Sequence, residues 1–101
     1  MIVRLTYLQF LPGALAESKR FYNEVAIPTV RKQKGNLDCR LLEPTDEKDD
    51  FISMTVWDNQ EDADAYESTG VYKSLVDQVR GNLAKPPVLK VYQAEGVLEH
   101  A

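Results

Sequence analysis

The sequence predicts an α+β domain with the order strand, helix, strand, strand, helix, strand. Two regions, 14–33 and 58–79, carry apolar residues at the three- to four-residue spacing of a helix. Shorter apolar stretches, typical of strands, occur at 2–10, 37–43, 51–57 and 88–93. A chain of 101 residues fits one domain with a modest core.

The first strand, 2–10, has two largely apolar faces. One face carries Val3, Leu5 and Tyr7, and the other carries Ile2, Thr6, Leu8 and Phe10 together with Arg4. Because neither face is polar, we expect both to be covered. Leu11-Pro12-Gly13 ends this strand.

The first helix, 14–33, is predicted to bury one side. That side carries Leu15, Ser18, Phe21 or Tyr22, Val25 and Thr29. Pro28 cannot donate a backbone hydrogen bond to the carbonyl of Glu24, so we expect a kink or restart at 25–28. Gly35 and Asn36 then stop the helix.

The next two strands are predicted to form a hairpin around the charged turn 44–50. In the strand 37–43, one face carries Leu37, Cys39 and Leu41. In the strand 51–57, one face carries Ile52, Met54 and Val56, and the other carries Phe51, Ser53, Thr55 and Trp57. The only tryptophan of the chain therefore stands at the end of a strand, directly before a helix.

Asp58 or Asn59 is suited to cap the second helix, because acidic residues follow in its first turn. The helix is expected to run to about residue 67 and to loosen at 68–70. The apolar side resumes with Val71, Leu75 and Val79, and Gly81 and Asn82 end it. A last strand, 88–93, completes a domain of residues 1–93. Residues 94–101 are expected to be a tail, with His100 a tail residue and no ligand.

This order is the split βαβ, or ferredoxin-like, arrangement: a four-stranded antiparallel sheet with two kinked or split helices on one face. The opposite sheet face is then bare, although every strand has apolar residues on both sides. A second copy of the chain is the simplest cover for such a face. We therefore expect a homodimer formed through the open sheet face.

Charge and composition exclude several functions. The net charge of −4 argues against nucleic acid and anionic membranes as partners, and no apolar run is long enough to span a bilayer.

The N-terminus has no signal pattern, so a cytoplasmic location is expected. Cys39 is predicted to be a buried, inert thiol. The acidic residues at 46–50 and 58–64 are predicted to form a solvated turn and the start of a helix, and not a metal site.

The candidate functional residues that remain are aromatic. They are Tyr7, Phe21, Tyr22, Trp57, Tyr66, Tyr72 and Tyr92. These rings either pack as core or line a pocket for a flat ligand between the sheet and the helices. No histidine lies in the predicted domain to serve as a general base.

Residues 51–75 also resemble a known family. Met54-Thr55-Val56-Trp57, the acidic helix start 58–63, Tyr66, Ser68 and the stretch 71–75 resemble the signature of the antibiotic biosynthesis monooxygenase (ABM) superfamily. Pro28 and Gly35-Asn36-Leu37 agree with it, and the resemblance covers residues 1–93. It implies a dimeric α+β barrel of the ferredoxin-like kind.

The resemblance does not extend to every functional position of the family. Tyr66 stands where many quinol-oxidising relatives have a histidine. Val76 stands where the haem-degrading branch has its iron ligand, so haem degradation is rejected. The polyketide oxygenase branch has a tyrosine and an asparagine flanking the tryptophan, and those positions are Ala63 and Ser53 here.

The leading hypothesis is therefore a cofactor-independent monooxygenase that uses O₂ on a small aromatic or quinol-like substrate, with no metal. Catalytic roles are expected for Tyr66, as hydrogen-bond donor to a phenolate, and for Trp57, which would wall the ring. The expected substrate-binding residues are Tyr7, Phe21, Trp57, Tyr66 and Tyr72.

Two alternatives remain from the sequence. One is a non-catalytic dimeric domain of the same fold that binds a small ligand or serves as an accessory domain. The other is isomerisation or decarboxylation of a small oxo-acid, which needs an anion site. Arg4, Arg40 and Lys90 are possible donors for that site, but all three are expected to point outward.

Overall fold

The computed structural model describes residues 1–96 and confirms the predicted order of elements. The strands are β1 (Ile2–Leu8), β2 (Asn36–Leu42), β3 (Phe51–Trp57) and β4 (Val88–Gln93). The helical elements are α1 (Leu15–Phe21), η1 (Tyr22–Ala26), α2 (Ile27–Arg31), α3 (Gln60–Ser68), α4 (Val71–Val79) and η2 (Arg80–Asn82). Residues 97–101, which include His100 and most of the predicted tail, lie outside the described part.

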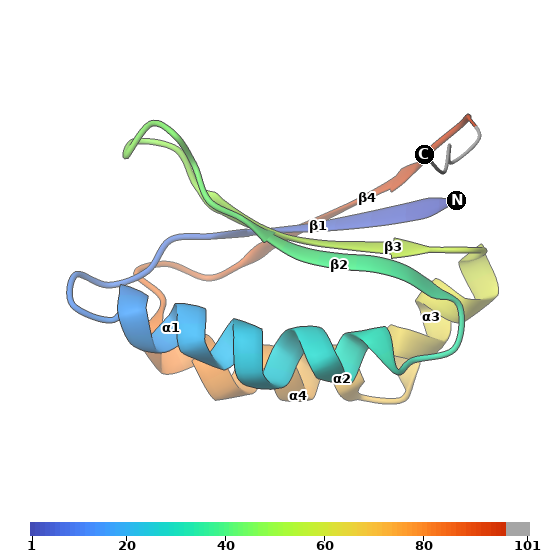
Figure 1. Ribbon diagram of the computed structural model, residues 1–101, viewed down its shortest axis with the longest axis horizontal. Coiled ribbons are helices and arrows are strands. Elements are labelled where there is room, and N and C mark those ends of the chain that lie inside the picture. The colour runs from blue at the N-terminus through green and yellow to red at the C-terminus, as the bar shows by residue number, and fades with distance from the viewer. Residues whose placement is uncertain (97–101) are drawn as a thin grey trace.

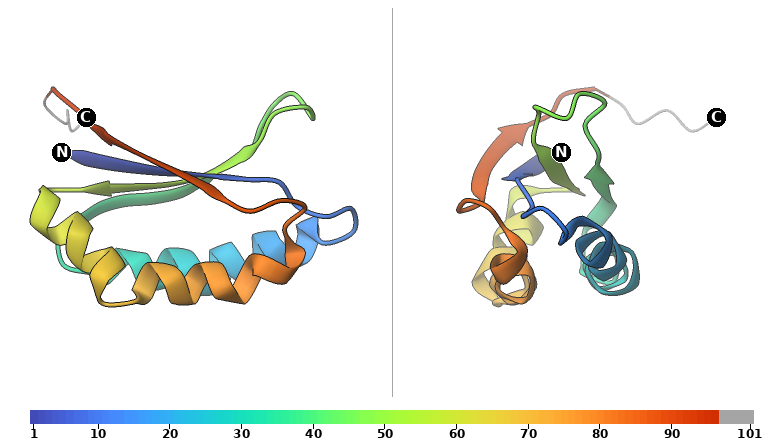
Figure 2. Two further views of the ribbon diagram at one scale, coloured as in Figure 1. Left: turned by 180° about the vertical axis from the view of Figure 1, so that it is seen from behind. Right: turned by 90° about the vertical axis from the view of Figure 1, so that its left-hand side faces the viewer.

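The four strands form one antiparallel sheet in the order β2-β3-β1-β4. Both helical lines, α1–η1–α2 and α3–α4, run beneath the same face of this sheet, and within residues 1–96 the opposite face carries no element (Figures 1 and 2). The fold is therefore the predicted ferredoxin-like α+β fold with an open sheet face. No helix within residues 1–96 has the length and apolar character needed to cross a bilayer.

Strand pairing decides which residues face the helices. Ile2 pairs with Trp57, Arg4 with Thr55 and Thr6 with Ser53, so these residues share one face. Burial alternates along β1, with Ile2, Arg4, Thr6 and Leu8 buried. The helix-covered face therefore holds a group of polar side chains in its middle.

The first helical line is interrupted as predicted, by a π-helical turn at η1. The Ile27 N–H donates to the Tyr22 carbonyl, five residues back, and Pro28 follows in the first turn of α2, where its missing N–H matters least. This wider turn changes which residues are buried. The buried stripe is Ser18, Tyr22, Ala26 and Val30, one residue in four, whereas the predicted Val25 is exposed.

The second helical line also matches its prediction. The Asn59 side chain caps α3 by accepting the Asp62 N–H at 2.8 Å, while its own amide donates to the Asp62 carboxylate. Gly70, with φ of +87°, makes the turn into α4. Leu75 and Val79 are buried, as their spacing predicted.

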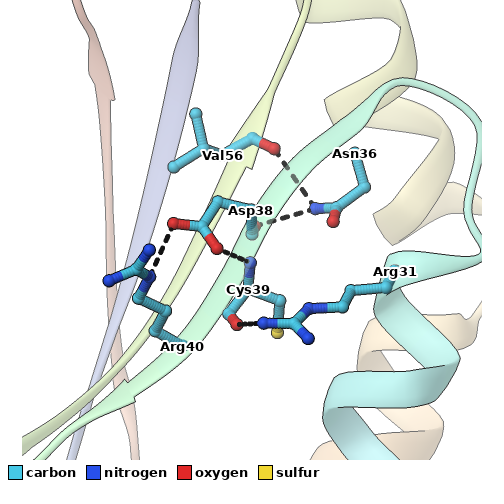
Figure 3. A network of polar contacts seen from close by, with 6 residues as sticks. All are labelled: Arg31, Asn36, Asp38, Cys39, Arg40 and Val56. Carbon is cyan, nitrogen blue, oxygen red and sulfur yellow. Dashed lines mark hydrogen bonds and ion pairs between the residues drawn. The ribbon is translucent and has the colours of Figure 1, made fainter. Parts of the chain in front are cut away.

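The prediction that Leu37 shares a strand face with Cys39 and Leu41 is wrong. A β-bulge between Asn36 and Asp38 interrupts the regular alternation of side chains at this point. The Asn36 amide donates to the carbonyls of Asp38 and Val56 across this irregularity (Figure 3). Leu37 is consequently exposed, while Cys39 faces the helices. The first strand is also shorter than predicted, because Phe10 forms only an isolated bridge with Leu83.

Candidate active site between the sheet and the helices

A small cavity lies between the sheet and the two helical lines, and we call it the tyrosine cavity. Its lining consists of Thr6, Tyr22, Ala26, Val30, Cys39, Ser53, Tyr66, Tyr72, Leu75 and Val76. The sheet and both helical lines contribute to it. Its volume of about 20 Å³ has room for about one water molecule.

Tyr66 and Tyr72 are the two predicted site residues that the cavity brings together. Their ring centroids lie 5.7 Å apart with an edge-to-face arrangement. Tyr66 comes from α3 and Tyr72 from α4, and the turn at Gly70 lets both rings reach the sheet. The Tyr72 hydroxyl lies 3.3 Å from the Thr6 hydroxyl, which fixes its end against β1.

Trp57 lies behind Tyr66 and outside the lining of the tyrosine cavity. The two rings stack with centroids 4.8 Å apart and an interplanar angle of 29°. Trp57 is completely buried, and its indole N–H donates to the Thr55 hydroxyl at 2.9 Å. In this arrangement Trp57 fixes the position of Tyr66.

Tyr7 and Phe21 do not join this group. Tyr7 lies on the open face of the sheet, where the Lys90 ammonium sits 5.1 Å from its ring centroid. Phe21 packs edge-on against Tyr22, with centroids 5.9 Å apart, and only Tyr22 reaches the cavity. Tyr7 lies on the same side of β1 as Val3 and Leu5. Arg4 and Thr6 lie on the other side, because successive side chains of a strand point to opposite faces.

The expectation that Arg4 points outward is wrong. Arg4 is only 4% exposed, and its guanidinium carbon lies 4.8 Å from the Tyr72 ring centroid and 5.5 Å from that of Tyr66. Its place on the covered side of β1 directs the side chain inward, and the long stem carries the charge onto the ring faces. Arg40, by contrast, is exposed and pairs with Asp38 at 2.8 Å (Figure 3).

Burial raises the pKa of three groups that line the cavity, Tyr22, Tyr66 and Cys39. Burial raises the pKa of Tyr22 to about 12, partly offset by the nearby Ser53 hydroxyl, and it raises the pKa of Tyr66 as well, where Arg4 opposes the effect. Burial raises the pKa of the Cys39 thiol to about 11. None of these three groups is a proton acceptor near pH 7.

Arg31 approaches Cys39 from the helical side. Its Nη2 donates to the Cys39 carbonyl at 3.3 Å, and its charge opposes the rise in the pKa of the thiol (Figure 3). This contact ties the end of α2 to β2 beside the cavity. Within residues 1–96, no three His, Cys, Asp or Glu side chains are grouped to hold a metal ion.

A groove on the outside of the helical layer lies over the cavity. It has a volume of about 340 Å³, and its lining consists of Val25, Thr29, Thr69, Gly70, Val71, Ser74, Leu75 and Gln78. Leu75 belongs to the linings of both the groove and the tyrosine cavity. Leu75 is therefore the one residue that contacts both volumes.

These features define a class of small ferredoxin-like domains with an aromatic site between the sheet and its helices. The family model for antibiotic biosynthesis monooxygenases matches residues 1–78. The chain belongs to this family.

Solved structures share the fold of this chain. A Nitrosomonas europaea protein, provisionally named an antibiotic biosynthesis monooxygenase, is 20% identical, with a TM-score of 0.78 over 93% of this chain and 98% of its own. SnoaB from Streptomyces nogalater, a cofactor-independent oxygenase, is 14% identical, with a TM-score of 0.79 over 98% of this chain and 97% of its own. Rv0793 from Mycobacterium tuberculosis is 15% identical, with a TM-score of 0.80 over 97% of this chain and 98% of its own. Among curated proteins no match was found.

Proposed function

We propose that this chain is a cofactor-independent monooxygenase of the ABM type that acts with O₂ on a small aromatic or quinol-like substrate. The observation that carries the proposal is the convergence of three tyrosines and a buried arginine between the sheet and the helices. Flat rings and hydroxyl groups in one site suit a flat, phenolic ligand. The fold shared with SnoaB, a cofactor-independent oxygenase, also supports it.

The proposed reaction needs little chemistry from the protein. A phenolate donates electrons directly to O₂; one oxygen atom then bonds to a ring carbon that loses its hydrogen. The other oxygen leaves as water, and the ring becomes a quinone. The protein orients the ring, excludes water and stabilises the anion. Tyr66 is the proposed hydrogen-bond donor to the phenolate oxygen, and Trp57 holds Tyr66 in place.

Substrate access would require the two helical lines to separate at Leu75. A benzene ring needs a cavity of about 150 Å³, more than the tyrosine cavity offers. The outer groove is large enough, and Leu75 alone is shared between the two linings. Displacement of Leu75 would join both volumes. Gly70 and the π-helical turn at η1 are the backbone irregularities beside this path.

Oxygen uptake with a panel of hydroquinones tests the proposal. We expect uptake above the buffer rate, and Tyr66→Phe should lower it about 10- to 100-fold, the effect of losing a hydrogen bond to a charged group. The control is Tyr92→Phe, because Tyr92 is half exposed on β4 and should leave the rate unchanged. No uptake above buffer, or equal rates for Tyr66→Phe and its parent, would contradict the proposal.

The second candidate is a non-catalytic dimeric domain that binds a small aromatic ligand or serves as an accessory domain. The observation in its favour is that burial keeps Tyr22, Tyr66 and Cys39 protonated near pH 7. A ligand recovered chemically intact after aerobic incubation would support this candidate, whereas conversion to a quinone would exclude it.

We also propose that two copies pair through the open sheet face, the arrangement implied by the family. This face carries Val3, Leu5, Ile52, Met54, Leu42, Val88 and Tyr92. Three of these side chains are well exposed in the single chain: Leu42 by 38%, Val88 by 47% and Tyr92 by 50%. Exposed apolar residues in one layer are typical of a subunit interface.

Light scattering during gel filtration should give twice the mass of the chain. Ile52→Glu should shift the protein to the mass of one chain, since its strand partners Tyr7 and Leu42 are uncharged and a carboxylate on this face would be buried without a partner in the pair. Gln78→Glu on the exposed side of α4 is the control and should remain paired. A parent protein that elutes as a single chain at micromolar concentration would refute the pairing.

A further inference from the structure

Arg4 carries a permanent charge in a place where the fold offers it little compensation. It is 4% exposed on the helix-covered face of β1, and a guanidinium does not lose its proton in proteins. Taking such a charge out of water is expensive unless well-placed partners accept its hydrogen bonds. A buried arginine that faces tyrosine rings therefore calls for a functional explanation.

The present partners of Arg4 satisfy it only in part. Nη2 donates to the Glu67 carboxylate at 3.3 Å, but the Glu67 side chain is 54% exposed. Nε is buried and has no acceptor among residues 1–96. Buried donors without an acceptor are rare in native proteins.

The surroundings of Arg4 place its charge next to the tyrosine cavity. From the helices, it meets the rings of Tyr66 and Tyr72 and the carboxylate of Glu67. Its strand neighbours, Thr55 on β3 and Val91 on β4, are uncharged. Both rings line the cavity, and Tyr72 lies nearer the guanidinium, so a ligand that displaces the Tyr72 ring meets Arg4 while Tyr66 stays stacked on Trp57. Glu67 is already half solvated and is free to remain in water when another anion takes its place.

We propose that Arg4 is a specificity residue, and that the site binds its aromatic ligand as a phenolate whose oxygen accepts a hydrogen bond from Arg4 Nε. The inference rests on the proposed function, because it assumes an aromatic ligand in the tyrosine cavity. It also explains how the site operates without a protein base. The positive charge lowers the pKa of the bound phenol, and the proton leaves to solvent. The substrate class is accordingly acidic phenols and hydroquinones.

Binding of 4-nitrophenol under anaerobic conditions tests the inference without any oxygen chemistry. Phenol and phenolate absorb at different wavelengths, so one titration gives both the affinity and the pKa of the bound ligand. We expect binding of the phenolate with a bound pKa below that in buffer. Arg4→Met should lose this shift and weaken phenolate binding about 10- to 100-fold. Arg4→Met is expected to fold, because an apolar residue of similar length replaces a poorly compensated buried charge.

Three controls separate recognition from structure. Nitrobenzene, which has no ionisable group, should bind the parent and Arg4→Met equally. Arg40→Met removes an exposed arginine and should bind nitrophenolate as the parent does. Glu67→Gln should bind it as tightly or more tightly, because a competing carboxylate is gone.

The outcomes distinguish the two proposals. Equal nitrophenolate affinity in Arg4→Met and the parent, or an equal loss of nitrobenzene binding, would overturn the role of Arg4. A parent that binds neither probe would overturn both the role of Arg4 and the aromatic site. Nitrophenolate binding that depends on Arg4, without oxygen uptake from any hydroquinone, would sustain this inference and overturn only the oxygenase proposal.

Discussion

Trp57→Ala is expected to lower the free energy of unfolding by about 3–5 kcal/mol. Trp57 is completely buried, stacks on Tyr66 and donates its indole N–H to Thr55. Its removal leaves a large void between the sheet and α3, and the Thr55 hydroxyl loses its donor. Chemical denaturation of the parent and the variant, followed by circular dichroism, measures the difference.

Trp57→Phe is the matched comparison for this prediction. It keeps a ring against Tyr66 and loses the indole N–H and some volume, so its loss should be about 1–2 kcal/mol. A Trp57→Ala variant as stable as the parent would show that Trp57 borders open space and does not fill a core position. The Trp57 side chain would then act directly as a wall for the substrate.

Gly35→Ala should destabilise the fold by about 3–5 kcal/mol, for two separate reasons. Gly35 has a φ of +79°, where a side chain adds about 1–2 kcal/mol of strain. A Cβ atom at this position would also lie 2.6 Å from the Cβ of Asp62, far inside van der Waals contact. Because Asp62 is held by the Asn59 cap, relief of the clash disturbs the start of α3. Thermal unfolding measures the loss.

Gly13→Ala isolates the backbone contribution. Gly13 has a φ of +86°, but a Cβ there would meet nothing within 4 Å. Its substitution should therefore cost about 1–2 kcal/mol, from backbone strain alone. If Gly13→Ala and Gly35→Ala lose equal stability, the close approach between Gly35 and Asp62 contributes nothing.

Periodicity was sufficient to predict the architecture, because each element has a regular spacing of apolar residues. The order of strands and helices, the interruption near Pro28, the capping residue Asn59 and the position of Trp57 at the end of β3 all follow from local rules. The features that were missed depend on backbone irregularities. The π-helical turn exchanges Val25 for Ala26 in the buried stripe, and the bulge after Asn36 exposes Leu37. Neither irregularity has a distinct side-chain pattern.

The candidate site was predictable in part. Tyr66 and Tyr72 lie in one helical region, so their approach follows from a helix that loosens between them. The position of Tyr7 required a choice between two apolar strand faces, which composition cannot make. Arg4 was missed because charged residues are usually exposed. Arg4 lies on the same side of the strand as Ile2, Thr6 and Leu8, and this pattern indicates a buried position. In this chain the strand pattern decides the burial of Arg4, although most arginines are exposed.

The open sheet face and the tyrosine cavity lie on opposite sides of the same sheet. If two copies pair through their open faces, both sheets separate the two cavities, and facing sheets pack about 10 Å apart. No side chain of one copy then reaches the ligand of the other. Any cooperativity between the two halves would then have to pass through the paired sheets, because no direct contact links the two ligands.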